Sequence, residues 1–152
     1  MWGGKQIYAF VGSGAAGAAE SLASATDIHT WTIPFRCRPI RAGFTLTQTV
    51  SGGTIPVVKF DRRPTAGSDD SRGDGDVGTI TLSATAAAGK AYYENTDYKE
   101  DATGYWVDTL NEGDEVVVQV TTASAGNGAG NPWLLVEINP EQPANNTAMV
   151  AG

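Results

Sequence analysis

The chain has 152 residues, a mass of 15.8 kDa and a formal net charge of −7, so it is long enough for one domain with its own core and too short for a second domain of ordinary size. Only 10 Lys and Arg residues are present, which excludes a protein that wraps nucleic acid, because phosphate neutralisation needs clustered cations. The 19 glycines and 7 prolines disfavour long helices and favour many turns.

The first 27 residues are rich in glycine and alanine, and we expect them to form an N-terminal arm. Residues 12–17 match the G-x-G-x-x-G pattern of dinucleotide-binding folds. Such a fold needs further βαβ units, whereas the following residues predict consecutive strands, so we expect no nucleotide and no other cofactor. The chain also has no run of about 18 apolar residues, which argues against a membrane partner. We expect a soluble protein made in a cytoplasm.

Between residues 28 and 138, short runs of β-branched and aromatic residues alternate with clusters of Gly, Pro, Ser, Asp and Asn. This pattern predicts a jelly-roll-like antiparallel β-sandwich of about eight strands, which we place at residues 28–35, 42–50, 55–62, 78–83, 90–93, 105–109, 115–122 and 133–138. Gly52 and Gly53 separate the second and third strands, and they predict that these two strands form an antiparallel hairpin.

The run at residues 115–120 shows which face of one strand should be buried. Val116, Val118 and Val120 share a face that we expect in the core, whereas Val117 points to the other side. Val117 is therefore a candidate contact with a partner. Trp133, in the last predicted strand, is a second candidate.

Residues 63–77 predict a long polar loop with almost no apolar residue. Its candidate calcium ligands are the acids Asp69, Asp70, Asp74 and Asp76. Calcium prefers several carboxylate oxygens on a flexible backbone, but Arg72 stands where an EF-hand loop needs an oxygen ligand. The default expectation is a solvated acidic loop without a bound metal.

A second segment, residues 92–106, combines aromatic side chains with acids. Its candidate interface residues are Tyr92, Tyr98, Tyr105 and Trp106. Tyr and Trp anchor protein interfaces, and they also pack in protein cores. Aromatic rings beside carboxylates also suit a glycan, so core, protein interface and glycan site remain open.

Groups for catalysis are few. His29 is the single histidine, and it shares a strand face with Trp31 and Ile33, which favours a packed imidazole. Cys37 is the single cysteine, so no intrachain disulfide forms, and we expect a small buried residue. No G-x-S-x-G motif is present. The sequence predicts a protein that is not an enzyme.

The stretch that runs from residues 33–35 through 57–64 to 110–118 resembles small β-sandwich proteins of tailed-phage virions, of the capsid decoration, cement or head-fibre type. The resemblance implies a structural protein on the virion surface, made in the host cytoplasm, that forms a homo-oligomer and contacts the major capsid protein or other virion proteins. An alternative is a binding module for a receptor or glycan on a phage tail or fibre. Residues 139–152 are expected to form an extended tail that orders on a neighbour.

Overall fold

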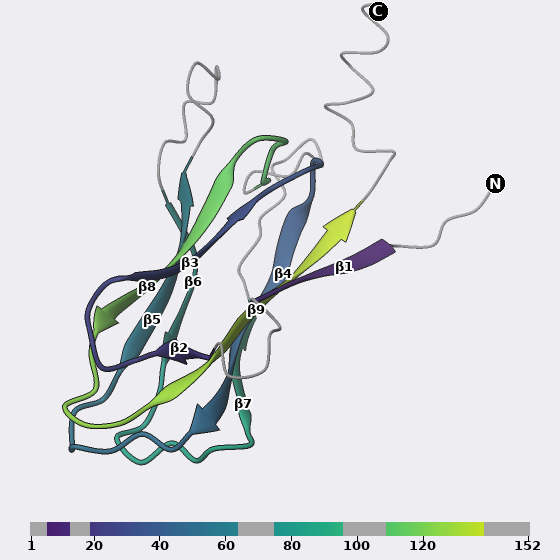
Figure 1. Ribbon diagram of the computed structural model, residues 1–152. Helices are drawn as coiled ribbons and strands as arrows, with labels where there is room; N and C mark the ends of the chain where they lie inside the picture. The colour runs from purple at the N-terminus through teal and green to yellow at the C-terminus, as the bar shows by residue number, and fades with distance from the viewer. Residues whose placement is uncertain (1–5, 13–18, 64–74, 96–108, 139–152) are drawn as a thin grey trace, which may run out of the picture.

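The structure is a computed structural model that describes residues 6–12, 19–63, 75–95 and 109–138. These residues form nine strands and no helix (Figure 1). One antiparallel sheet contains β1 (Gln6–Val11), β2 (Glu20–Ser21), β4 (Arg38–Gln48), β7 (Ala91–Asn95) and β9 (Ala129–Ile138). The other contains β3 (Asp27–Thr32), β5 (Val57–Arg63), β6 (Gly75–Thr81) and β8 (Glu115–Thr122). The prediction of an all-β sandwich is confirmed.

The pairing of the strands is that of a jelly roll. The five-stranded sheet has the order β1-β9-β4-β7, with β2 also on β9, and the four-stranded sheet has the order β3-β8-β5-β6. Early strands thus pair with late ones in reverse order: β1 with β9, β3 with β8, β4 with β7 and β5 with β6. A chain folded back on itself and then rolled up gives this arrangement, which closes one core between two sheets.

The hairpin predicted around Gly52 and Gly53 is wrong. β4 pairs with β7 and β9, and β5 lies in the other sheet. Both glycines have positive φ, 95° and 83°, so the turn exists, but it carries the chain from one sheet to the other. The crossing places β4 and β5 in opposite sheets, so each strand packs against the common core from its own side.

The N-terminal segment differs from the expected arm. Residues 6–11 form β1, which pairs with β9 from Gln6 opposite Ile138 to Val11 opposite Trp133. Leu22 is fully buried. The sandwich therefore includes residues before 28, and the unbroken apolar and aromatic run from Ile7 to Val11 was the signal for a strand there. Residues 13–18, 105–108 and 139–152 lie outside the described residues, so the glycine motif, most of one expected strand and the expected tail are not placed.

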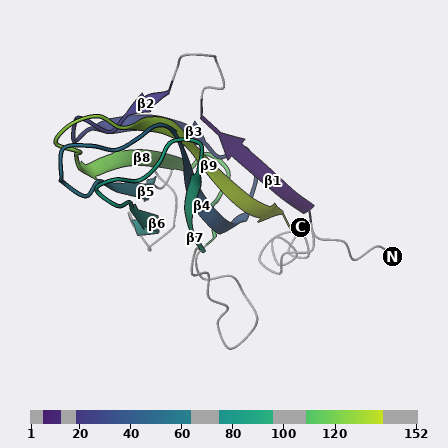
Figure 2. The same ribbon diagram turned by 90° about the horizontal axis from the view of Figure 1, so that it is seen from below.

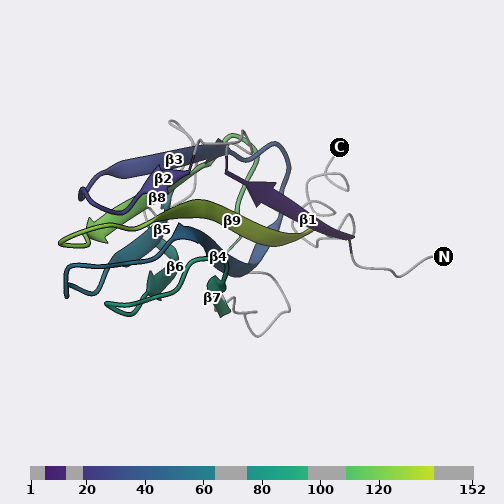
Figure 3. The same ribbon diagram turned by 60° about the horizontal axis from the view of Figure 1, so that its bottom comes forward.

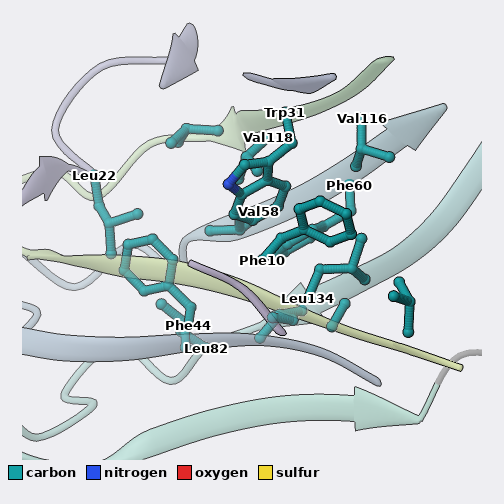
Figure 4. Packing of buried hydrophobic residues seen from close by; sticks show 14 of the residues in the cluster. Phe10, Leu22, Trp31, Phe44, Val58, Phe60, Leu82, Val116, Val118 and Leu134 are labelled. Atoms are coloured by element: carbon teal, nitrogen blue, oxygen red, sulfur yellow. The ribbon is translucent and has the colours of Figure 1, made fainter. Parts of the chain in front are cut away.

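The core lies between the two sheets and is rich in aromatic rings (Figure 4). The rings of Trp31 and Phe60 stack with centroids 6.0 Å apart, and Phe10 of β1 lies 6.1 Å from Trp31. Val116 and Val118 are fully buried, as their alternation predicts. Complete burial of one such valine contributes about 1.5–3 kcal/mol.

Two buried ion pairs fix strands to their neighbours. Arg62 Nε lies 3.0 Å from Asp114 Oδ2, and the same oxygen accepts the backbone N–H of Asn111 at 2.8 Å. Arg38 Nη2 lies 2.7 Å from Glu137 Oε2, across β4 and β9. Because all four charged side chains are nearly inaccessible to water, each charge depends on its hydrogen-bonded partner.

Candidate interaction surface

Part of the outer face of the five-stranded sheet carries apolar side chains, where a water-facing sheet is normally polar. Partners in an antiparallel ladder share a face, so the register places Ile7 beside Glu137, Val11 beside Trp133, and Gly43 between Trp133 and Tyr93. Their neighbours along the strands, such as Phe10, Leu134 and Phe44, are buried in the core. We name this surface the outer apolar face and define it as Ile7, Val11, Tyr93, Trp133 and Leu135.

Three members of the outer apolar face are strongly exposed: Ile7 to 55%, Val11 to 61% and Tyr93 to 54%. Trp133 and Leu135 are partly buried between them. Single exposed apolar residues are ordinary on a protein surface, whereas a contiguous group across three strands is a candidate contact site.

Trp133 is held flat across the neighbouring strand. A Cβ atom at Gly43 would lie 2.0 Å from Trp133 Cζ2, so the ring occupies the space that any other residue would fill there. The indole N–H donates to Thr45 Oγ1 at 3.0 Å. The ring of Tyr93 lies next to it, with the Tyr93 and Trp133 centroids 6.4 Å apart. The Arg41 guanidinium lies 4.3 Å from the centre of the Tyr93 ring. The result is an ordered aromatic platform with a cation stacked beside it.

A groove opens between β6 and β7, where the two sheets meet at their edges. Its volume is about 490 Å³, and its lining includes Thr79, Ile80, Tyr92 and Glu94. The backbone N–H of Thr79 donates to Glu94 Oε2 at 3.1 Å and thereby links the two strands. Tyr92, a predicted interface residue, is half-buried, and its hydroxyl accepts the N–H of Ala87.

The other predicted contact residues have different outcomes. Val117 is only 1% exposed, so it is not an available surface contact, although it lies outside the hydrophobic core cluster as its register predicts. Trp133 belongs to the outer apolar face. Tyr98, Tyr105 and Trp106 lie outside the described residues. Ile7 and Val11 were not among the predicted contact residues, although the apolar run of β1 contains both. Tyr93 lies within the aromatic segment 92–106 that the sequence indicated.

No metal centre is formed by the part of the chain that the structure describes, where no group of three or more His, Cys, Asp or Glu side chains comes together. Of the four acids considered for calcium, Asp69, Asp70 and Asp74 lie outside the described residues. Asp76 belongs to β6 and pairs with Asp61 of β5 in the ladder.

The single histidine and the single cysteine are packed groups. The His29 ring lies against Trp31, with centroids 5.0 Å apart, and its Nδ1 is 3.9 Å from Glu20 Oε1. Cys37 is fully buried. Burial raises the pKa of its thiol from 9.0 to about 12, with a further contribution from the negative charge of Asp114. The thiol is therefore protonated near neutral pH, which removes the thiolate that nucleophilic chemistry needs.

Within the described ranges, no helix has the length and hydrophobicity needed to cross a membrane.

Comparison with known proteins gives one weak structural likeness. No protein-family model matches the chain, and no curated protein matches it. A chain of the solved structure described as "Capsid of Ralstonia phage GP4" is similar to this chain at 18% sequence identity, over 89% of this chain and 83% of that one, with a TM-score of 0.47.

Proposed function

We propose that the protein is a non-enzymatic structural component of a phage virion that decorates or cements the capsid through oligomeric contacts. The observation that carries the proposal is the outer apolar face, where Ile7, Val11 and Tyr93 are each more than half exposed. Large exposed apolar groups of this kind are costly on an isolated monomer and are covered by a partner in an assembly. The proposed assignment to a phage virion rests on the sequence resemblance. The jelly roll supports it as a fold that viral capsid domains use.

The chemistry of the described side chains favours assembly over catalysis. The Cys37 thiol is buried and its pKa is raised. Two of the buried acids, Asp114 and Glu137, are ion-paired with arginines. These acids hold strands together, which leaves them unsuited to exchange protons with a substrate.

The partners we propose are further copies of the chain and the major capsid protein or other virion proteins. A net charge of −7 disfavours contact with nucleic acid. The outer apolar face has Arg41 beside it and the Arg38–Glu137 pair at one end. Its centre is apolar with charges around it, as in many protein interfaces.

A second candidate function is recognition of a glycan or receptor, and the aromatic platform favours it. Trp133 is fixed by Thr45 and by the absence of a side chain at Gly43, and Tyr93 extends the flat surface. A rigid, exposed aromatic ring suits stacking on a sugar as well as on a protein side chain. Lectin domains also use the jelly roll.

The two functions are separated by testing particles and sugars with the same protein. For the structural role, virions of the phage that encodes the chain are purified and analysed by quantitative mass spectrometry and immunogold labelling. We expect many copies per particle on the outer surface, and absence from purified virions overturns the proposal. For the alternative, the recombinant full chain and Trp133→Ala are compared on a glycan array. A signal that Trp133→Ala abolishes, for a protein absent from the capsid, establishes the second candidate.

A further inference from the structure

β1 differs from the other strands that end a sheet. The edge strands of the two sheets are β1, β7, β3 and β6, and β2 also lies on the outer side of β9. Each of the others contains a charged residue: Glu20 in β2, Asp27 in β3, Asp76 in β6 and Glu94 in β7. The sequence of β1, Gln-Ile-Tyr-Ala-Phe-Val, has no charge and no proline, and its pairing with β9 has no bulge. Charges, prolines and bulges are how proteins protect sheet edges from pairing with another chain, so β1 is the unprotected edge.

The backbone groups of β1 that point away from the sheet are identified by two hydrogen bonds. The N–H of Gly12 donates to Pro132 of β9 at 2.8 Å, so the backbone groups of residue 12 face β9. The direction of the backbone N–H and C=O groups alternates from one residue to the next along an antiparallel strand. Even-numbered residues of β1 therefore face β9, and Ile7, Ala9 and Val11 direct their backbone N–H and C=O groups away from it. In agreement, the carbonyl of Val11 accepts the indole N–H of Trp31 from the other sheet.

The open part of this edge is therefore the stretch from Ile7 to Ala9. Figures 2 and 3 show β1 at the side of the molecule, and in the described part of the chain no strand pairs with its outer edge. The exposed side chains here are also apolar or aromatic, with Ile7 exposed to 55% and Tyr8 to 46%. Unpaired backbone donors and acceptors next to apolar side chains are what an added β-strand recognises.

We infer that two copies of the chain join edge to edge through antiparallel pairing of their β1 strands, across a twofold axis at Tyr8. Ile7 then lies opposite Ala9 of the partner subunit, and Ala9 lies opposite Ile7 of the partner subunit. The outward N–H and C=O groups of both residues are satisfied in both copies, because a twofold contact repeats each bond. The inference deepens the proposed function and rests on it, since it names the self-contact of the proposed oligomer.

The charge distribution favours a second copy at this place. Each copy carries a net charge of −7, so two copies repel each other over most of their surfaces. β1 itself carries no charge. The neighbouring charge on the outer face is Glu137 of β9, opposite Ile7, and it is neutralised by Arg38 of β4 at 2.7 Å. Pairing along β1 also joins the two five-stranded sheets into one continuous sheet, with both outer apolar faces on the same side.

The first test changes the outward backbone hydrogen bonds alone. Ala9→Pro removes an N–H that β9 does not use, and edge strands tolerate proline there. The matched control is Ala91→Pro in β7: Lys90 O accepts from Leu46 of β4, so the N–H of Ala91 also points away from its sheet. Sedimentation of the full chain should show dimers for the wild type, a dimer at least tenfold weaker for Ala9→Pro, and an unchanged dimer for Ala91→Pro. The melting temperatures of the two variants should be alike. A monomeric wild type, or equal effects of both prolines, overturns the inference.

The second test is a cross-link that does not depend on the proline variants folding. Opposed residues at the axis are a non-hydrogen-bonded pair, whose short Cα separation suits a disulfide. Tyr8→Cys should form a disulfide-linked dimer rapidly, because Cys37 is buried and leaves position 8 as the accessible thiol. Ile55→Cys, at a similarly exposed residue (48%) in the connection between β4 and β5, lies outside both β1 and the outer apolar face; it is the control and should cross-link slowly. Equal rates at both positions contradict the inference.

The two proposals fail separately. A chain found on virions that is monomeric and cross-links equally at both positions keeps its structural role and loses the β1 contact. A chain that dimerises through Tyr8 but is absent from virions keeps the β1 contact and loses the capsid role.

Discussion

The indole N–H of Trp31 donates to the backbone carbonyl of Val11 at 2.8 Å and joins the two sheets at the end of β1. Trp31 belongs to β3 of the four-stranded sheet, whereas Val11 ends the edge strand of the five-stranded sheet. β1 has β9 as its one strand partner among the described residues. β9 therefore holds one edge of β1, and the bond from Trp31 holds the other edge at Val11.

Replacing Trp31 with Phe keeps an aromatic ring beside Phe60 and removes the bond to Val11. We expect a loss of about 0.5–1.5 kcal/mol in the free energy of unfolding from the hydrogen bond, with faster hydrogen exchange at Phe10, whose N–H faces β9. Trp133→Phe is the comparison, because its bond to Thr45 lies on the outer face. Unchanged exchange at Phe10 in Trp31→Phe would show that β1 is held by β9 alone.

A methyl group at Gly43 should displace the aromatic platform. Its Cβ would lie 2.0 Å from Trp133 Cζ2, and overpacking of this kind costs about 1–3 kcal/mol. Tryptophan fluorescence should shift as the ring moves. The double variant Gly43→Ala/Trp133→Ala is the check: once the ring is gone, the added methyl should cost little, so the two changes are not additive. Additive losses would mean that Gly43 matters for a reason other than the ring.

Neighbouring arginines of β5 should differ strongly in their importance. Arg62→Met removes the cation from the buried carboxylate of Asp114, and breaking a buried pair costs about 3–5 kcal/mol. Arg63 is 42% exposed and lies 3.7 Å from Asp27, so Arg63→Met should cost less than about 1 kcal/mol. Urea denaturation of both variants measures the difference. Similar losses would contradict the structural assignment of the two side chains.

Ionisation of Cys37 should lower stability in alkaline solution. Its pKa is about 12 in the folded chain against an ordinary value of 9.0. Because burial favours the protonated thiol, its stabilising effect is complete below pH 9 and is lost as the pH rises toward 12. The free energy of unfolding of wild type should fall more steeply in this range than that of Cys37→Ala. A thiol reagent should react at mildly alkaline pH only after denaturant is added. Rapid labelling of the native chain would refute the burial.

Periodicity in the sequence predicted the fold class because core-facing apolar residues alternate along a strand with residues that face away from the core. The run at residues 115–122 coincides with β8, and Val116, Val118 and Val120 are buried. The pairing of strands was harder, since Gly52 and Gly53 reveal a turn without revealing which sheet the chain enters next. That choice depends on contacts between distant segments, such as β4 with β9.

The candidate surface was only partly visible in the sequence. Trp133 was chosen, but its neighbours Val11 and Tyr93 come from strands far away in the chain, and only the register of the sheet brings them together. For Val117 the prediction was wrong in the other direction. Its position on the outward face of β8 was taken to mean that it is exposed, yet it is only 1% exposed. Alternation identifies the face on which a residue lies, and burial also depends on what covers that face.

The pairing of Gln6 with Ile138 makes the protein a suitable scaffold for engineering. Opposed residues of an antiparallel ladder lie about 5 Å apart, so the start of β1 and the end of β9 can be joined by a short designed turn. New termini could then be opened at the Gly52–Gly53 turn, which connects the two sheets. In the unpermuted chain, peptides fused before β1 and after β9 would start from neighbouring points, so two different tags could be presented as a pair.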